Sequence, residues 1–167
     1  MADFNLEMTR TIPQLRRYAR ALVKSVDSAD DLVQDCLERA CSRKQLWDES
    51  KPIRPWLFTI LHNVYANNAR RFHHSPALVS IDHIEESAMP SNGVDMSLKD
   101  LRKGLDMLSD EHRQILLLVG LEQLSYKEAA EILGIPLGTV MSRIARARKN
   151  LHQFMNEPSS TNIRRVK

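Results

Sequence analysis

The sequence predicts an all-α protein made of two small helical domains joined by a linker. Glycine is scarce, with five residues in 167, and few stretches show the apolar–polar alternation that half-buried strands require. Apolar residues recur instead at spacings of three and four, which gathers them on one face of a helix. A chain of this length has room for one domain or for two small ones.

The first predicted domain, residues 7–75, begins with two helices. Residues 7–24 place apolar side chains on one face and arginines on the other. A second helix then runs to about residue 46. Asp27 or Ser28 is expected to cap it, because a side-chain oxygen at that point accepts hydrogen bonds from the free amide groups of the first turn.

A third helix completes this domain. It is expected to begin after Pro52 or Pro55, since proline is tolerated in the first helical turn, where its missing N–H is not needed. The helix continues through residue 72. Trp56 and Phe58 are expected to pack in the core.

The second predicted domain covers residues 98–155. Residues 76–97 contain prolines and scattered acids without a sustained period, so they are interpreted as the linker. Leucines spaced three and four apart then predict a helix that leads to Ser109, a capping residue for the next helix. Residues 156–167 form a basic tail.

A helix-turn-helix is predicted within the second domain. Ser125 and Glu128 have the spacing of a capping box at the start of its first helix. Gly134 follows that helix where a positive φ is often required, and Pro136 suits the start of the next helix. In the second helix one face is apolar and predicted to be buried, comprising Val140, Ile144, Ala147 and Leu151.

The opposite face of that helix is polar and basic. From residue 141 to residue 167 there are seven Lys or Arg residues and one acid. Guanidinium and hydroxyl groups in this arrangement suit phosphates and the guanine edge in the major groove. The pattern favours DNA binding over an ordinary helical hairpin with a solvated basic face.

Charge is segregated along the whole chain, although the net charge is only +3. Residues 51–81 contain four Lys or Arg and no acid, whereas residues 77–111 contain eight acids and three bases. Together with the basic C-terminal segment, this pattern predicts two nucleic-acid-binding surfaces separated by an acidic segment that does not bind phosphates.

Other classes of protein are disfavoured. No apolar run approaches the length of a membrane span, and the N-terminus lacks a signal pattern, so a cytoplasmic protein is expected. Cys36 is expected in the core, and neither it nor Cys41 belongs to a zinc-type ligand spacing. We expect no metal and no cofactor. No nucleophile–base pattern or phosphate-binding glycine loop is present, which predicts that the protein is not an enzyme.

Three segments, in order, resemble the sigma factors of bacterial RNA polymerase of the extracytoplasmic-function type. Residues 30–40 are similar to the helix of that family that binds core polymerase. Residues 54–63 resemble its promoter −10 segment, and residues 108–143 resemble its −35-binding domain. The resemblance implies sigma region 2 at residues 7–75 and sigma region 4 at residues 98–155.

The resemblance also implies a role for each exposed face. Core polymerase, through the clamp helices of its largest subunit, is expected to bind Asp31, Gln34, Asp35 and Glu38. The opened −10 strand is expected to contact Thr59, Asn63, Asn67, Arg70 and Arg71, beside a pocket-shaping loop at about residues 69–76. The −35 duplex is expected to contact Thr139, Ser142, Arg143, Arg146 and Lys149, with Arg143 and Arg146 reading bases. An anti-sigma partner is implied by the resemblance alone.

Two alternatives remain at this point. A conventional helix-turn-helix regulator would explain residues 109–152 but not the acidic face at Asp31 and Asp35. A sigma mimic that titrates an anti-sigma factor need not keep DNA-reading residues such as Asn63 and Arg143, which are present here. The promoter consensus, the inducing signal and the identity of the partner do not follow from the sequence.

Overall fold

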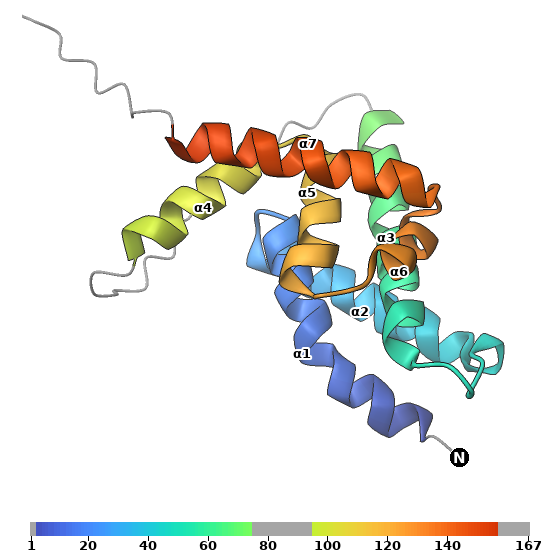
Figure 1. The fold of residues 1–167 in the computed structure, drawn as a ribbon. Coiled ribbons are helices and arrows are strands. Elements are labelled where there is room, and N and C mark those ends of the chain that lie inside the picture. Colours follow the sequence, from blue (N-terminus) through green and yellow to red (C-terminus); the bar gives the residue numbers. More distant parts are fainter. Residues whose placement is uncertain (1–2, 75–94, 157–167) are drawn as a thin grey trace, which may run out of the picture.

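A computed structural model describes residues 3–74 and 95–156, and over these ranges the chain is helical without strands, as predicted (Figure 1). The N-terminal half contains three long helices and a short 3₁₀ turn. The C-terminal half contains four helices and a π-helical turn. In chain order the elements are α1 (Phe4–Leu22), α2 (Val26–Ser42), η1 (Lys44–Leu46), α3 (Ile53–His74), α4 (Asp95–Met107), α5 (Asp110–Leu116), η2 (Leu117–Leu121), α6 (Tyr126–Leu133) and α7 (Leu137–Asn156).

Several predicted boundaries are wrong by a few residues. The cap of α2 is Ser25, whose hydroxyl accepts from the Ser28 amide at 3.1 Å, and not Asp27 or Ser28. Ser25 has the extended backbone of an N-cap, while the next residues are already helical. The helix ends at Ser42 rather than near residue 46, and η1 occupies the difference.

Two segments beside and within the predicted linker also differ. α3 was predicted to run through residue 72 and instead continues to His74, so residues 69–74 of the predicted pocket-shaping loop at about residues 69–76 are helical. Residues 95–97 belong to α4. The predictions for residues 75–94 and 157–167, including the rest of the linker and most of the basic tail, lie outside the described residues.

The three N-terminal helices pack around a core that α1, α2 and α3 all supply. Phe58 of α3 is fully buried and meets Tyr18 of α1 edge to face, with ring centroids 5.3 Å apart. Cys36 of α2 is fully buried as expected, and burial raises the pKa of its thiol to about 12. The prediction for Phe58 is confirmed, whereas Trp56 is half-buried and packs against the core.

The predicted helix-turn-helix forms from α6 and α7. Ser125 accepts from the Glu128 amide at 3.1 Å while the Glu128 carboxylate accepts from the Ser125 amide at 2.8 Å, which completes the capping box. Gly134 ends α6 with φ of 64°. The apolar face of α7 is buried at Val140, Ile144 and Ala147, and it packs on α5. The capping box, the left-handed Gly134 and these three buried residues were predicted from sequence. Leu151, also predicted to be buried, is only half-buried, because it lies near the end of α7 against α4.

The two halves of the chain lie against each other. α6 packs on α3, η2 packs on α1, and buried apolar side chains from both halves form one continuous cluster. Figure 1 shows α7 crossing over one end of this assembly, with α4 alongside its C-terminal part. The close approach of α4 to α7 occurs at Gly104, where a Cβ atom would lie only 2.7 Å from Cδ1 of Leu151.

Replacing Gly134 by alanine is expected to destabilise the protein by about 1–2 kcal/mol, because an L-residue is strained at a positive φ. No atom outside the turn lies within 4 Å of the added methyl group, so crowding contributes nothing. Urea unfolding measures the change. Gly138→Ala is the matched control: its site in the first turn of α7 is equally open and lacks a positive φ, so alanine there is expected to change stability by no more than about 0.5 kcal/mol. Equal effects at the two sites would contradict the strain argument.

Candidate nucleic-acid interface

The outer face of α7 presents most of the side chains predicted to contact duplex DNA. Ser142, Arg146 and Lys149 are exposed, and Thr139 is half-buried. The Ser142 hydroxyl donates to the Thr139 carbonyl at 3.1 Å, which leaves its oxygen able to accept. The buried side of the helix holds this face outward, so these four side chains are accessible in the structure as it stands.

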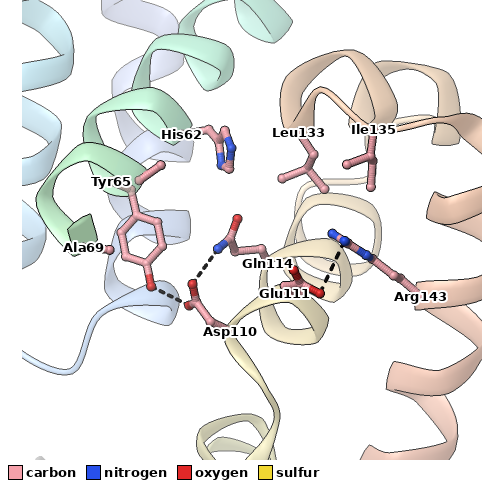
Figure 2. Close-up of a pocket in the computed structure, with 10 residues that line it drawn as sticks. His62, Tyr65, Ala69, Asp110, Glu111, Gln114, Leu133, Ile135 and Arg143 are labelled. Atoms are coloured by element: carbon pink, nitrogen blue, oxygen red, sulfur yellow. Dashed lines mark hydrogen bonds and ion pairs between the residues drawn. The ribbon is translucent and has the colours of Figure 1, made fainter. Parts of the chain in front are cut away.

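Arg143 has a different environment. Its Nη2 lies 3.3 Å from a carboxylate oxygen of Glu111 on α5, and only 25% of its side chain is exposed. It borders a cavity of 340 Å³ whose opposite wall is α3, with Tyr65 and Ala69 among its residues (Figure 2). The structure therefore separates Arg143 from the other four predicted side chains by turning it toward the N-terminal half.

The polar side of α3 presents a row of amides. Asn63 and Asn67 are exposed and lie one turn apart, and Arg70 and Arg71 continue the exposed surface toward the end of the helix. Thr59, one turn earlier, is half-buried and donates its hydroxyl to the Pro55 carbonyl at 2.9 Å. The row can supply hydrogen bonds to exposed base edges, with two guanidinium groups beside it for phosphates.

The acidic face of α2 is fully accessible. Asp31, Gln34, Asp35 and Glu38 are all exposed, and the Gln34 amide donates to Glu38 at 3.1 Å. A groove of 790 Å³ lies beside this face, with Val33 and Leu37 among its lining residues. Carboxylates along an apolar groove are suited to a basic helical partner.

Sequence reasoning missed the most heavily bonded acid in the described chain. Glu122 has a side chain with no exposed surface, and it forms ion pairs with both Arg17 of α1 and Arg54 of α3. Arg17 binds it with two hydrogen bonds, Nε to Oε1 at 2.9 Å and Nη2 to Oε2 at 2.8 Å. The available signal was an acid directly after the apolar run Ile115–Leu121, where a charge requires partners.

A second polar contact joins the halves near the cavity. The Tyr65 hydroxyl donates to one oxygen of Asp110, while Gln114 donates to the other at 2.8 Å. Burial, followed by the hydrogen bond to Asp110, raises the pKa of Tyr65 to about 12. Burial lowers the pKa of the neighbouring His62, so this imidazole stays neutral at pH 7. The charged residues of the cavity wall are therefore Arg143 of α7 and Asp110 and Glu111 of α5.

No three potential metal-ligating side chains cluster anywhere in residues 3–74 or 95–156, and no helix there is long and apolar enough to cross a membrane. A helix-turn-helix with a basic outer face is the DNA-binding module of transcription proteins. The class defined by the fold is therefore an all-α DNA-binding protein, with a three-helix bundle packed against its helix-turn-helix.

Two family models match the two halves. Residues 8–62 match the sigma2 domain of PhyR, and residues 98–151 match sigma-70 region 4. The sigma factor EcfG of Rhodopseudomonas palustris is 32% identical over 150 residues, covering 89% of this chain and 83% of that protein. SigM of Bacillus subtilis is 31% identical, covering 84% of this chain and 87% of that protein.

A solved structure is similar over nearly the whole chain. It is the Bartonella quintana sigma factor RpoE in complex with the anti-sigma factor NepR, 31% identical, with a TM-score of 0.73 over 93% of this chain and 98% of that one. The chain belongs to the extracytoplasmic-function RNA polymerase sigma factors. These alternative sigma factors are transcription initiation factors and not enzymes, as predicted.

Proposed function

We propose that this chain directs core RNA polymerase to specific promoters, reading the −35 element as duplex and the −10 element as opened strand. The observation that carries the proposal is the presence of three accessible faces in one chain: acidic on α2, amide-bearing on α3 and basic on α7. A conventional helix-turn-helix regulator would need only the basic face on α7. Residues 7–75 are assigned to polymerase and −10 binding, residues 98–155 to −35 binding, with residues 76–97 linking them and residues 156–167 as a tail.

On the −35 side, α7 enters the major groove. Arg146 and Arg143 are assigned to base edges, because guanidinium groups bind the O6 and N7 atoms of guanine in a bidentate manner. Thr139, Ser142 and Lys149 are assigned to phosphates and to the thymine methyl group. The exposure of Arg146, Ser142 and Lys149 supports these roles. Arg143 can contact a base only after its ion pair with Glu111 breaks.

On the −10 side, Asn63 is the principal candidate for a contact to an unpaired base. It lies at the centre of the row Thr59–Asn63–Asn67, one turn from each neighbour. Splayed bases are held by stacking and by hydrogen bonds to their free edges, which amides can provide. Arg70 and Arg71 then hold the backbone of the opened strand.

The two protein partners occupy other surfaces. The α2 face at Asp31, Gln34, Asp35 and Glu38 is assigned to the clamp helices of the largest polymerase subunit, since its carboxylates complement basic side chains. An anti-sigma factor is proposed as the inhibitor, supported by the similar Bartonella quintana sigma factor, which was solved with one.

Transcription in vitro tests the proposal. Purified core polymerase and the full chain are incubated with a promoter library, and initiated transcripts are sequenced. Specific initiation that depends on both a −35 and a −10 motif is expected. Duplex binding without initiation would instead indicate a conventional regulator.

Arg143→Ala is expected to cost about 1–3 kcal/mol at one −35 base position, the value of a bidentate base contact. Initiation from single-base −35 variants measures the loss. Lys149→Ala is the matched control, because removal of a phosphate contact weakens all variants alike. A uniform loss with Arg143→Ala would reassign this residue to a phosphate.

A second candidate function has one specific observation in its favour. Residues 8–62 match the sigma2 domain of PhyR, a name that also occurs for a structure described as an anti-anti-sigma factor. A chain that only titrates an anti-sigma factor would bind NepR-like partners and fail to initiate transcription. The same assay with core polymerase separates the two functions.

A further inference from the structure

Two large apolar side chains are exposed next to each other at the start of α7. Leu137 is 49% exposed and Met141 is 54% exposed. They are four positions apart, which places them one turn apart on the same edge of the helix. Within residues 3–74 and 95–156, no other two large exposed apolar side chains lie one turn apart on one helix. Single exposed apolar residues are common, so it is the pairing of these two that calls for a ligand.

The face of α7 beside this pair carries only small side chains in the first turns of the helix. Gly138, Ser142 and Ala145 are exposed, and their spacings of four and three place them on one face. A Cβ atom added to Gly138 would meet no atom within 4 Å, so the space in front of the first turn is open. A helix with so low a face can lie deep in a major groove, where side chains on both of its edges reach the bases.

The small face separates two edges of different chemistry. At about 100° per residue, Met141 lies about 70° to one side of this face and Arg146 lies about 70° to the other. Both side chains are exposed. A guanidinium group donates to O6 and N7 of guanine, whereas an apolar side chain contacts the 5-methyl group of thymine. The two edges therefore suit different base pairs.

The spacing of Met141 and Arg146 relates the positions of these base pairs. The two residues are five positions apart in the sequence. Five positions correspond to about 7.5 Å along a helix, and base pairs are stacked about 3.4 Å apart. A helix that follows the groove therefore places the two contacts about two base pairs apart.

The apolar edge is better suited to DNA than to a protein partner. Arg148 follows Met141 by seven positions, so it continues the same edge, and it is exposed. The edge therefore changes from apolar to cationic within two turns. A protein partner with an apolar surface would need a longer apolar edge, whereas a duplex offers methyl groups inside the groove and phosphates beside it.

We propose that Met141 reads the 5-methyl group of a thymine in the −35 duplex, about two base pairs from a guanine that Arg146 reads. Leu137 extends the apolar contact away from Arg146. This inference deepens the proposed role of α7 at the −35 element and rests on it.

Deoxyuridine tests the methyl contact directly, because it pairs with adenine as thymine does and lacks only the methyl group. Each −35 thymine of a promoter chosen by the transcription assay is replaced in turn. Binding of the full chain with core polymerase is then measured. At one thymine the replacement is expected to weaken binding about fourfold, the value of one buried methyl group. Arg146→Ala identifies the guanine, which should lie about two base pairs from that thymine.

Met141→Ala is expected to bind the thymine and deoxyuridine templates equally. Its site is exposed and alanine favours a helix, so the fold should be retained, and circular dichroism checks this. Met155→Ala shortens another exposed methionine of α7 and is the matched control, which should keep the fourfold difference. If Met141→Ala fails to fold, Met141→Gln, which keeps the length of the side chain and removes its apolar end, provides the result.

Three outcomes would overturn the proposal. The wild type could bind thymine and deoxyuridine equally at every −35 position, or the fourfold difference could persist in Met141→Ala. The third outcome is a loss with Met141→Ala that is the same on templates with and without the methyl group, which would assign this edge to a protein partner. Absence of initiation by the wild type would instead refute the sigma role. The same replacements in a duplex selected by binding to the full chain alone would then decide the methyl contact.

Discussion

Asp31→Lys combined with Asp35→Lys is expected to abolish binding to core polymerase while the fold is retained. Both carboxylates are exposed, one turn apart on α2, so the substitutions disturb no buried contact. Against a basic partner, reversed charges replace attraction by repulsion, which costs several kcal/mol, or a loss of about a hundredfold or more in affinity.

Co-purification with core enzyme and a titration of labelled protein measure this loss, and thermal unfolding monitors the fold. Glu49→Lys is the control, since it reverses an exposed charge of the same half outside the α2 face. Normal co-purification of the double variant would refute the assignment of this face to polymerase.

Phe58→Ala is expected to destabilise the N-terminal bundle by about 3–5 kcal/mol. The ring is fully buried, contacts Tyr18 edge to face, and lies 5.6 Å from the Arg54 guanidinium carbon. Its removal leaves a cavity at the junction of α1 and α3, next to the residues that bind Glu122.

The loss is measured by urea unfolding. Phe72→Ala is a matched control on the same helix: this ring is 83% exposed, and its replacement is expected to change stability by no more than about 0.5 kcal/mol. A small effect at Phe58 would show that the bundle closes around the lost ring.

Helices whose ends carry local chemistry were predicted correctly from sequence. Ser109 caps α5, Ser125 and Glu128 form the capping box, and Gly134 takes the left-handed conformation. Each interaction spans three or four residues, so it depends little on the rest of the fold. The predicted cap of α2 was wrong because several neighbouring side chains offer the same local interaction. The side chains of Ser25, Asp27 and Ser28 can all accept hydrogen bonds from backbone amides, so the local sequence does not distinguish them, and Ser25 is the cap in the structure.

Exposed faces were also predictable, because a buried apolar stripe defines the opposite side of its helix. Asp31, Asn63 and Arg146 lie on such faces and are exposed. Arg143 shares the polar side of α7 by spacing, yet it is turned toward α3 and paired with Glu111. Its neighbours come from helices distant in sequence, and helical periodicity carries no information about them.

The helices, the caps of α5 and α6 and the charge of each exposed face could be predicted from sequence, because they follow from interactions within about one helical turn. Long-range packing brings α6 onto α3 and joins Glu122 to Arg17 and Arg54 across 105 and 68 residues of chain, and neither contact could be predicted from sequence. Desolvation explains the difference. A carboxylate enters the interior only where the whole fold brings cations to it, and no local pattern specifies that meeting.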